Sequence, residues 1–588
     1  MMDSVKSFKG YGKVDPLEEQ AYRRKTRRRL IILAVSLVLL IALIVGAVVG
    51  TVAHKKSGSG DSKSTSPSGT SSAQSIKAMC SVTEYPDSCF SSISAMEGAN
   101  STTDPKKLFQ LSLQVVMDSL EELSGLPETW SESTSDPELK SAFNVCQVVF
   151  QDAIDSTNDS ISLFTPESNS KVDPLSPVGI RDLKTWLSTT LTNLDTCIDA
   201  IVELNNTDPT ILNEVKTSMS NSTQFASNSL AIAAKFIAFL NKFIPPHRRL
   251  LSEVGSSGFP SWVKAADRKL LQAPAGENPK ADVVVASDGS GDYKTIKEAL
   301  GKVPTNSDTR FVIYVKAGVY SEKVTVEKQM WNVYMYGDGK NKTIVTGSAN
   351  FVDKTPTFRT ATFAALGKGF IAKNMGFQNT AGAAKHQAVA LRSISDKSVF
   401  YDCWFDAYQD TLYAHTNRQF YSNCDITGTV DFIFGNAAVI FQSCNIMPRQ
   451  PDPGQFVTLT AQGKSNSEQT SGTVIQNCNI FAYPKDNVTT KLYLGRPWKD
   501  YSTTIFAQSN LNAPIDPQGW SQWNSSVIPP PTIFYAEYLN RGIGSDVSKR
   551  VTWAGYKSNL TATQLVEFGV PKFLDGQSWI AAAQVTFT

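Results

Sequence analysis

The chain has 588 residues, of which 41% are hydrophobic and 19% are charged, so it is too long for one ordinary domain and predicts two or three parts. Its net charge of +2 divides into +7 for residues 1–56, −9 for residues 57–271 and +4 for residues 272–588. The last part has no long basic stripe, which disfavours a nucleic-acid-binding protein, and four histidines leave few candidates for a histidine-based metal site.

An apolar segment at residues 30–53 is the first predicted element. It has no charged side chain over 24 residues, which as a helix is long enough to cross a membrane. Six Lys and Arg residues lie at 23–29, so residues 1–29 are predicted to be a cytoplasmic basic head and the rest to be exported. A buried helix of a soluble domain is the disfavoured alternative. The length fits an uncleaved transmembrane signal anchor at least as well as a cleaved signal peptide.

Two further features agree with export. All eight cysteines follow the apolar segment, and an even number in an exported chain indicates disulfide bonds. No C-x2-C pair is present, which disfavours a zinc ribbon. Asn-x-Ser/Thr sequences give candidate glycosylation sites at Asn100, Asn158, Asn205, Asn221, Asn341, Asn487, Asn524 and Asn559.

Residues 54–78 are rich in Ser, Gly and Thr and predict a flexible linker. Residues 79–245 then show helical periodicity, with apolar runs at 108–120, 143–154, 180–198 and 230–243. Asp104-Pro105 and Asp136-Pro137 are predicted helix starts, because proline is tolerated in the first turn. Four runs with short breaks favour an antiparallel four-helix bundle. No catalytic constellation is evident in this segment, so we expect a structural or binding role.

The cysteines of this segment form two candidate disulfides. Cys80 and Cys89 enclose Pro86 and could close a small hairpin, whereas Cys146 and Cys197 lie in two different helical runs and could join them. With these cysteines and Pro86, the segment resembles the pectin methylesterase inhibitor and invertase inhibitor family over about 165 residues. The resemblance implies a helical, inhibitor-like pro-domain.

Residues 246–271 are predicted to be a processing linker. They contain two basic-Leu tetrads, Arg248-Arg249-Leu250-Leu251 and Arg268-Lys269-Leu270-Leu271. Subtilisin-type processing proteases cut exposed, basic sites of this kind, and a cut at the second tetrad would release residues 272–588. The alternative is that these residues are ordinary solvated charges of a linker. Two similar tetrads in one linker make this alternative less favoured.

Beyond residue 280 the periodicity changes to that of short strands, with β-branched and aromatic runs at 311–315, 331–336, 387–391, 457–460 and 503–507. A short signature also repeats, and its central positions are 375, 403, 424, 444, 478 and 509. The spacing has a minimum of 20 residues with variable excess, which predicts an all-β, right-handed parallel β-helix whose loops absorb the surplus.

Four consecutive central positions are cysteines. Stacked strands lie about 4.8 Å apart, so these cysteines are candidates for disulfides between neighbouring rungs. Pairing Cys403 with Cys424 and Cys444 with Cys478 leaves none free, and a Cys424–Cys444 bond is the competing choice.

The same register brings two aspartates together. Asp410 lies seven residues after Cys403, and Asp431 lies seven residues after Cys424, so we expect them at equivalent positions on neighbouring rungs. Two facing carboxylates do not both ionise readily, so one pKa rises, and that difference suits an acid paired with a nucleophile. A solvated pair on a sheet face is the alternative.

Four motifs of this body closely resemble plant pectin methylesterases. They are GAAKHQAVAL at 382–391, YQDTLY at 408–413, GTVDFIFG at 428–435 and LGRPW at 494–498. The resemblance spans residues 282–588 and implies a right-handed β-helix that hydrolyses methyl esters of pectin without a metal or organic cofactor. Met375 departs from the pattern, because some relatives carry cysteine there, and this leaves the disulfide pairing open.

The resemblance also implies roles for individual residues. Asp431 would be the nucleophile, held charged by Arg496, and Asp410 would be the proton donor and then the general base. Gln387 and Gln409 would supply amide donors for the oxyanion. The residues expected to contact substrate are Thr357, Gln387, Arg496, Trp498, Tyr413 and Trp520.

The whole chain then resembles an inhibitor-domain-bearing pectinesterase. We expect a membrane-anchored precursor in the secretory pathway and a mature enzyme in the extracellular cell wall. Its partners would be methylesterified pectin, separate pectin methylesterase inhibitors and a subtilisin-type protease that cuts at Arg249, Leu251, Lys269 or Leu271. The opposite charges of −9 and +4 lead us to expect that the bundle caps the active-site groove until cleavage.

Other functions are disfavoured by missing motifs. The sequence has no Gly-x-Ser-x-Gly for a Ser-His-Asp esterase, and neither the adjacent Asp pair nor the Gly-His-Gly that a polygalacturonase would need. A catalytically silent wall-binding or inhibitor protein is the second class considered, and the four complete motifs argue against it. A permanently anchored membrane protein is the third.

Overall fold

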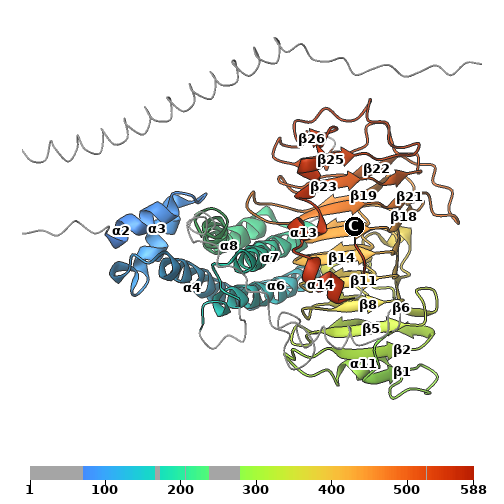
Figure 1. Cartoon of the computed structure of the whole chain (residues 1–588), viewed down its shortest axis with the longest axis horizontal. Coiled ribbons are helices and arrows are strands. Elements are labelled where there is room, and N and C mark those ends of the chain that lie inside the picture. Colours follow the sequence, from blue (N-terminus) through green and yellow to red (C-terminus); the bar gives the residue numbers. More distant parts are fainter. Residues whose placement is uncertain are drawn as a thin grey trace, which may run out of the picture. The chain divides into compact units, whose positions relative to one another are not determined.

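The computed structural model describes residues 71–165, 172–204, 207–237, 278–524, 526–583 and 585–587 (Figure 1). The predicted basic head at 1–29, the apolar segment at 30–53 and the processing linker at 246–271 lie outside these residues. Among the helices of the described residues, none combines the length and the apolar composition that crossing a membrane requires.

The N-terminal described part is helical. Its elements are α2 (Ser72–Cys80), α3 (Pro86–Ala95), η1 (Ala99–Ser101), α4 (Pro105–Ser124), α5 (Leu126–Glu132), α6 (Pro137–Ser162), α7 (Pro177–Val202), α8 (Pro209–Ala231) and the π-helical η2 (Ile232–Ile237). The long helices α4, α6, α7 and α8 pack together as the predicted bundle. Helix α2 begins inside the predicted flexible linker, because Ser71 and Gln74 cap its first turn reciprocally.

All four long helices begin with the same signature. A capping side chain accepts backbone N–H groups of the first turn, and a proline follows at the first helical position. Asp104 and Asp136 confirm the two predicted starts, and Ser176 and Asp208 repeat the rule at starts that the sequence analysis did not predict.

The predicted fourth helical run at 230–243 is helical over its described residues, 230–237, but it misses most of the fourth long helix. Helix α8 begins at Pro209 and ends at Ala231, so the predicted run overlaps only its last two residues. The buried face of α8 includes Ser222, Ser227 and Asn228, which makes its hydrophobic periodicity too weak to recognise in the sequence.

Two disulfides hold the bundle, as predicted. Cys80–Cys89 joins the end of α2 to α3 with a Cα–Cα distance of 5.7 Å, and Cys146–Cys197 joins the middle of α6 to α7 at 4.4 Å. Both bonds restrict the unfolded chain, so they stabilise the small helical part.

The rest of the chain is a parallel β-helix, as predicted, built from three sheets in which every pair of strands is parallel (Figure 1). In stacking order the first sheet is β1 (Val283–Val285), β2 (Phe311–Val315), β5 (Val333–Gly337), β8 (Ile371–Lys373), β11 (Ser398–Tyr401), β14 (Arg418–Ser422), β17 (Ala438–Gln442), β20 (Gly472–Gln476), β23 (Thr503–Ala507), β25 (Phe534–Tyr538) and β26 (Tyr556–Lys557).

The second sheet is β3 (Gly318–Ser321), β6 (Thr343–Gly347), β9 (Gly376–Asn379), β12 (Trp404–Asp406), β15 (Asp425–Gly428), β18 (Asn445–Pro448), β21 (Asn479–Ile480) and β24 (Asn510–Leu511). The third is β4 (Val324–Val326), β7 (Phe363–Ala365), β10 (Leu391–Ser393), β13 (Leu412–Ala414), β16 (Ile433–Gly435), β19 (Val457–Gln462) and β22 (Leu492–Gly495). Short helices complete the fold: α11 (Ile296–Leu300), η3 (Thr357–Arg359), η4 (Ala383–Lys385), α12 (Ala562–Val566), α13 (Val570–Phe573) and α14 (Gln577–Ala582).

The predicted strand at 387–391 is mostly wrong. Only Leu391 belongs to β10, and residues 387–390 form a loop before it. The loop still follows the neighbouring rung, because Ala388 N donates to Gln409 O at 3.2 Å and Ala390 N donates to Thr411 O at 2.9 Å. These backbone contacts explain the β-like sequence of a segment that carries site residues.

The predicted repeat positions stack in the structure. The residues that follow them pair in register as Gly376, Trp404, Asp425, Asn445, Asn479 and Asn510 along the second sheet. Each repeat position is preceded by a residue with φ between 51° and 57°, the left-handed conformation that turns one sheet into the next. Asn and Asp tolerate this conformation best, and they occupy four of these six positions, at Asn374, Asp402, Asn423 and Asn477.

The predicted disulfides of the β-helix are not formed. Cys403, Cys424, Cys444 and Cys478 occupy the stacked position but are free and buried, so neither the two expected bonds nor the competing Cys424–Cys444 bond is present. Side chains at equivalent positions of parallel strands point the same way about 4.8 Å apart, whereas a disulfide needs Cβ atoms about 3.8 Å apart. The thiols donate instead to backbone carbonyls, such as Cys424 Sγ to Phe400 O at 3.4 Å.

Aromatic rings stack from rung to rung in the core. Phe405 is fully buried, stacks on Phe377 at 5.6 Å between ring centroids, and meets Phe400 and Tyr421 edge to face. Replacing Phe405 by alanine would leave a cavity, so we expect it to lower the free energy of unfolding by about 3–5 kcal/mol. Urea unfolding measures this change.

The matched control for Phe405→Ala is Val319→Ala, because the Val319 side chain is 64% exposed. We expect that control to change the free energy of unfolding by less than about 0.5 kcal/mol. Equal losses from the two variants would contradict the stacked core.

Candidate functional site

The two predicted aspartates lie at equivalent positions on neighbouring rungs. Leu412 of β13 pairs with Ile433 of β16, and Asp410 and Asp431 each lie two residues before that pair. Asp410 N donates to Val430 O at 3.0 Å, which ties the two loops together. Both aspartates adopt positive φ values, 62° and 50°, a backbone conformation that costs free energy and is frequent at functional sites.

Asp431 is held in one orientation by four hydrogen bonds from the side chains of Arg496 and Thr458. Arg496, the first residue after β22, donates through Nε to Oδ1 at 2.9 Å and through Nη2 to Oδ2 at 2.6 Å. The Thr458 hydroxyl donates to Asp431 Oδ1 at 2.6 Å and accepts from Asp431 N at 2.8 Å. This bidentate, charge-assisted arrangement favours an ionised carboxylate.

Asp410 has the opposite electrostatic environment. Its side chain is buried, and burial raises the pKa of this carboxyl well above its usual value. The negative charge of Asp431 raises the pKa further, and Arg496 opposes the shift only in part. The pair therefore combines a carboxylate clamped by Arg496 with a carboxyl whose pKa is raised, the division that an acid and a nucleophile require.

The predicted amide donors lie beside this pair. Gln409 immediately precedes Asp410, and Gln387 precedes Ala388, whose N–H donates to Gln409 O at 3.2 Å. Among the described residues, the buried Gln409 Oε1 has no hydrogen-bond partner, so this amide is available to a ligand. The backbone segments that carry the two amides are thus joined on adjacent rungs, and one of them leads directly into Asp410.

Aromatic side chains border the site. Trp498 is half-buried and stacks on Trp523 at 6.2 Å between ring centroids, and Trp523 also lies 4.4 Å from the Arg496 guanidinium. Tyr413 stacks on Phe434 at 4.2 Å. The sequence did not indicate Trp523, Thr458 or Phe434. Trp523 and Thr458 lie outside the four motifs, and Phe434 lies within one of them but was not singled out.

The prediction that Trp520 contacts substrate is wrong. Its side chain is 1% exposed and packs against Phe506 and Tyr535 inside the β-helix. Its Nε1 donates to Glu537 Oε1 at 3.3 Å, so the indole is satisfied within the core.

Comparison with known proteins identifies this arrangement. The family described as "Pectinesterase" matches residues 282–577. The chain belongs to the pectinesterase family. The family described as "Plant invertase/pectin methylesterase inhibitor" matches residues 74–232, so both resemblances found in the sequence are confirmed.

The similarity to curated pectinesterases extends over the whole chain. The sequence is 54% identical over 592 residues to Pectinesterase 3 of Phaseolus vulgaris, which covers 100% of this chain and 99% of the relative. It is 52% identical over 594 residues to Pectinesterase 1 of Arabidopsis thaliana, which covers 99% of each. The solved pectin methylesterase from carrot is 48% identical, with a TM-score of 0.51, and covers 53% of this chain and 98% of that one.

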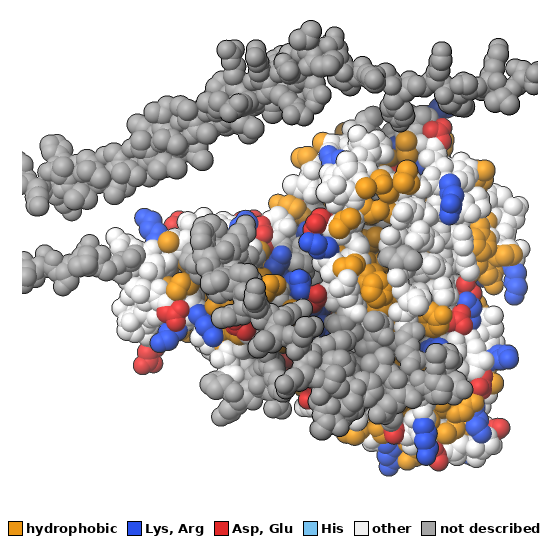
Figure 2. All heavy atoms as spheres, viewed as in Figure 1, with side chains coloured by type: hydrophobic (Ala, Val, Ile, Leu, Met, Phe, Trp, Pro, Cys, Tyr) orange, Lys and Arg blue, Asp and Glu red, His pale blue; other side chains and the backbone are white. Residues whose placement is uncertain are grey.

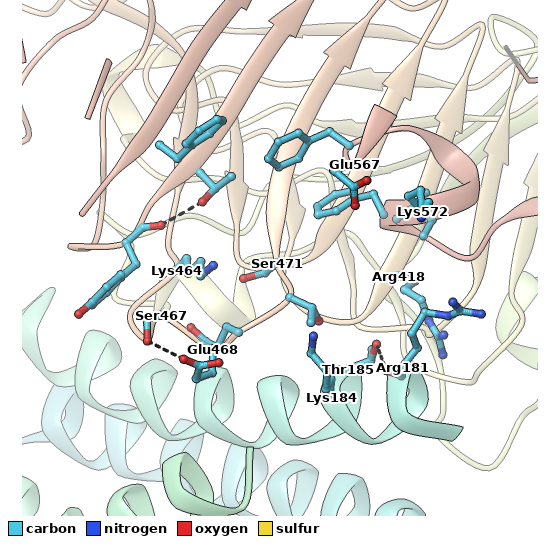
Figure 3. Close-up of a pocket in the computed structure, with 18 of the residues that line it drawn as sticks. Arg181, Lys184, Thr185, Arg418, Lys464, Ser467, Glu468, Ser471, Glu567 and Lys572 are labelled. Carbon is cyan, nitrogen blue, oxygen red and sulfur yellow. Dashed lines mark hydrogen bonds between the residues drawn. The ribbon is translucent and has the colours of Figure 1, made fainter. Parts of the chain in front are cut away.

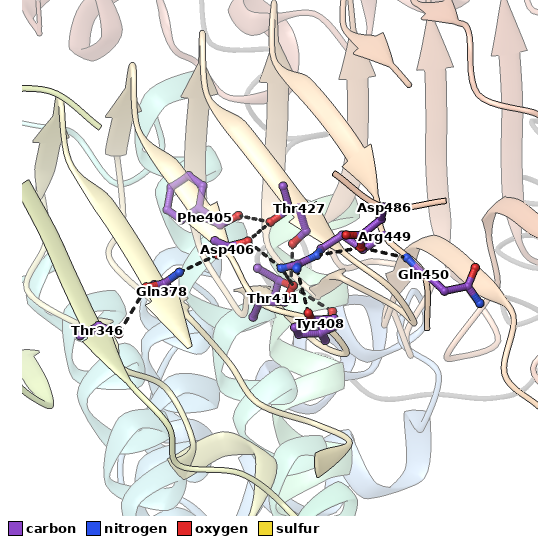
Figure 4. A network of polar contacts seen from close by, with 11 residues as sticks. Thr346, Gln378, Phe405, Asp406, Tyr408, Thr411, Thr427, Arg449, Gln450 and Asp486 are labelled. Carbon is purple, nitrogen blue, oxygen red and sulfur yellow. Dashed lines mark hydrogen bonds and ion pairs between the residues drawn. The ribbon is translucent and has the colours of Figure 1, made fainter. Parts of the chain in front are cut away.

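A polar network behind the pectinesterase site fixes the loop that carries Asp410 (Figure 4). Arg449 follows β18 and donates through Nη1 to Asp406 Oδ1 at 3.0 Å and through Nη2 to the Tyr408 hydroxyl at 2.8 Å. Its guanidinium also lies 4.0 Å from the Tyr408 ring centroid. Arg449 therefore holds both ends of the segment that leads directly into Gln409 and Asp410.

The inhibitor-like bundle lies on the site through α7. Carboxylates recur every four residues along one face of the C-terminal half of this helix and its end. Asp195 accepts a hydrogen bond from Ser465 Oγ, Asp199 pairs with Lys499 Nζ, and Glu203 accepts from Thr357 N at 3.2 Å. Thr357 and Lys499, which border the groove, are thus already engaged by the bundle.

Apolar contacts extend the same interface. Phe358, Val389, Tyr413 and Phe434 belong to one buried cluster with the core of the bundle, and Trp498 packs against it. The bundle therefore covers the aromatic border of the pectinesterase site in the described structure, in agreement with the expected cap.

Burial at this interface shifts the pKa values of the α7 carboxyls. It raises the pKa of Glu203 to about 7 and that of Asp195 to about 6. Glu203 also raises the pKa of Asp410, so the bundle acts electrostatically on the site that it covers.

Proposed function

We propose that the β-helix is a carboxylic ester hydrolase that removes methyl esters from pectin and gives methanol and pectate. The observation that carries this proposal is the pair of buried carboxyls on neighbouring rungs, one clamped by Arg496 and the other with a raised pKa. Relatives named pectinesterase over the full length of the chain support it.

Asp431 attacks the ester carbonyl carbon with the electron pair of its carboxylate. The methoxy group leaves with the proton of Asp410 as methanol, so an anhydride between Asp431 and the substrate carboxyl remains. A water molecule then gives one proton to the ionised Asp410 and attacks the anhydride with its oxygen, which restores both aspartates and releases the pectate carboxyl group. That carboxyl group loses the second water proton to the solvent. Arg496 keeps Asp431 charged and oriented throughout.

Gln387 and Gln409 donate their amide N–H groups to the oxyanion of both tetrahedral intermediates. Such donors contribute most when they are fixed before the reaction, and removal of one costs about 3–4 kcal/mol of transition-state stabilisation.

The sugar rings of the substrate lie against aromatic side chains. We assign Trp498 to this contact, as expected from the sequence, and add Trp523, which stacks on it. Thr357 remains a proposed contact, because its loop becomes available once Glu203 departs. Tyr413 lies in the covered cluster and becomes part of the groove only after the bundle is removed.

We further propose that the bundle is a pro-region that a subtilisin-type protease removes by cutting at Arg249, Leu251, Lys269 or Leu271. The precursor would be anchored in the membrane by residues 30–53, and the released enzyme would act in the extracellular cell wall, where separate inhibitor proteins could also bind it. The Asn residues of seven of the eight predicted glycosylation sites are exposed, which supports passage through the secretory pathway, and Asn205 lies outside the described residues.

The test is a methanol-release assay on methylated pectin with the released β-helix. We expect methanol and new carboxylates in equal amounts, and no release by the Asp431→Ala variant. Full activity in both Asp431→Ala and Asp410→Ala would show that the assignment is wrong.

Arg449→Ala tests the positioning of the Asp410 loop. We expect kcat to fall by about 10- to 100-fold, because the loop loses its anchor and the reacting groups move out of line, with KM changed by less than about threefold. Arg449→Lys should not restore kcat, since lysine lacks the planar fork that reaches Asp406 and Tyr408 together.

The control for Arg449→Ala is Arg541→Ala, because Arg541 is exposed at the C-terminal end of the β-helix. It should leave both kinetic constants within about twofold. An Arg449→Ala variant that lowers stability but leaves kcat unchanged would mean that the network is structural only.

A further inference from the structure

A cavity separate from the carboxyl pair lies where α7 meets the loop at 464–471 and the C-terminal helices (Figure 3). Its volume is about 590 Å³, within the range of small-ligand sites. None of the proposed catalytic residues lines it. Lys and Arg side chains, together with a few carboxylates, gather on the surface where the helices meet the strands (Figure 2).

Among the lining side chains that form no ion pair, positive charges outnumber negative charges. Arg181 pairs with Asp575 at 2.7 Å, Arg418 pairs with two aspartates, and Glu468 pairs with Lys235 at 2.8 Å. Three lysines and one glutamate of the lining form no ion pair within the described part of the chain; they are Lys184, Lys464, Lys572 and Glu567. The cavity therefore presents an unbalanced cationic surface.

Two of these lysines come from different parts of the protein. Lys184 projects from α7 of the bundle, and Lys464 projects from the loop after β19 (Figure 3). Burial lowers the pKa of Lys464 to about 8 and also lowers that of Lys184. Glu468 attracts both ammonium groups, but its nearest ion pair is with Lys235, and burial outweighs this attraction at both lysines. A bound anion would relieve the cost of desolvation for both lysines.

The opposite wall is aromatic. Phe534 stacks on Phe568 at 5.4 Å between ring centroids, and Phe573 lies beside Phe568 at 5.9 Å. The Thr185 side chain lines the cavity as well. Flat apolar faces next to hydroxyl groups and ammonium groups match a ligand that has sugar rings and carboxylates.

We propose that this cavity binds a short oligosaccharide of galacturonate, the de-esterified product class, and this identification of the ligand rests on the proposed function. Because Lys184 belongs to the bundle and Lys464 to the β-helix, the complete site exists only in the uncleaved chain. A ligand that contacts both lysines binds the joined form and not the separated parts, so it stabilises the uncleaved chain by mass action.

Isothermal titration of the uncleaved full chain with trigalacturonate tests the proposal. We expect saturable binding, and a Kd about tenfold higher in Lys184→Gln and in Lys464→Gln, because each variant loses one charge-assisted hydrogen bond. The control is Lys216→Gln, which removes one positive charge from an exposed position of α8 and should leave Kd unchanged.

Two comparison ligands identify the chemistry that is recognised. A neutral galactose trisaccharide should not bind, and inorganic phosphate should bind at least about tenfold more weakly than trigalacturonate. Phosphate binding as tight as trigalacturonate would overturn the assignment to a sugar acid. At the same concentration, trigalacturonate should also raise the Tm of the uncleaved chain more than that of Lys184→Gln, which covers the case in which Lys464→Gln fails to fold.

Absence of trigalacturonate binding to the uncleaved chain, or equal Kd values for Lys184→Gln and the parent, would overturn the proposal. Methanol release by the separated β-helix is measured in parallel, and it does not involve Lys184. If the separated β-helix releases methanol but the uncleaved chain does not bind trigalacturonate, the cavity site alone is refuted. If the uncleaved chain binds trigalacturonate but the separated β-helix releases no methanol, the proposed function alone is refuted.

Discussion

Replacing Asp431 by asparagine is expected to lower kcat of the released enzyme by about 10⁴- to 10⁶-fold, the loss that follows removal of a nucleophile. Asparagine keeps the size of the side chain and one acceptor oxygen, so Thr458 Oγ1 and Arg496 Nε can still donate to that oxygen, whereas its NH2 group cannot accept from Arg496 Nη2. What disappears is the negative oxygen that forms the anhydride. Initial rates of methanol release, with folding checked by circular dichroism, measure the effect.

The partner variant Asp410→Asn should lose less, about 10²- to 10⁴-fold, because it removes proton transfer but leaves the nucleophile. Its pH profile should also differ from that of the parent. The parent needs Asp410 protonated, so its rate falls as pH rises through the raised pKa of that carboxyl. Asp410→Asn has no such group and should lack this alkaline limb.

The control for both variants is Asp425→Asn. Asp425 lies on the same rung as Asp431 but on the second sheet, where it pairs with Lys340 at 3.0 Å. We expect it to keep activity within about twofold, since such partly exposed pairs contribute little. Equal activity of Asp431→Asn and Asp425→Asn would exclude Asp431 as the nucleophile.

Sequence analysis predicted the β-helix and its carboxyl pair because both depend on register. A residue type that recurs once per rung, such as the cysteine at 403, 424, 444 and 478, reports the stacking directly. Once that register was known, equal offsets placed Asp410 beside Asp431. The residues that hold Asp431 could be predicted only in part. The resemblance implied Arg496, but no sequence pattern indicated Thr458. Thr458 lies two residues before Thr460, which pairs with Ile433, so it occupies the position equivalent to Asp431 on the next rung.

The errors have physical causes as well. The disulfides in the β-helix were expected from strand spacing alone, which ignores the direction of the side chains. Trp520 was expected to contact substrate from the family resemblance alone, but the side chain lies inside the core, where its indole donates to Glu537. The fourth long helix was misplaced because its buried face is polar. Contacts between α7 and the groove join residues more than 150 positions apart, as in Glu203 and Thr357, and no local pattern encodes them.

The second large effect that we expect is that the binding of the bundle to the β-helix depends on pH. The docked pKa values are about 7 for Glu203 and about 6 for Asp195, both raised from ordinary values by burial. A group whose pKa rises on docking takes up a proton when it docks. Docking is therefore strongest below the ordinary carboxyl pKa and weakens as pH rises through the docked values. The relevant window runs from about pH 4.5 to about pH 7.

The magnitude follows from the same linkage. Between pH 5 and pH 8, Glu203 alone would weaken docking by about 100-fold and Asp195 by about tenfold. With the linker cut and both parts present, methanol release should therefore be suppressed at pH 5 and recover toward pH 8. Titration calorimetry of the two parts against pH gives the docking constant directly.

Variants separate this proton linkage from simple charge attraction. Glu203→Gln and Asp195→Asn imitate the protonated groups, so the double variant should lose most of the difference between pH 5 and pH 8. Burial also raises the pKa of Asp199, which leaves a smaller residual dependence. Asp199→Asn loses its partner Lys499 and should weaken docking at both pH values. Glu214→Gln, at an exposed position of α8, is the control and should behave like the parent.

The charge attraction alone would produce the opposite trend. If the bundle docked because its carboxylates are ionised and the β-helix is positive, protonation at low pH would loosen it, and Glu203→Gln would bind more weakly than the parent at every pH. Burial of Glu203 and Asp195 outweighs their favourable contacts, and this is why their pKa values rise despite hydrogen bonds from Thr357 and Ser465. A docking constant that increases with pH would therefore show that attraction, and not desolvation, dominates this interface.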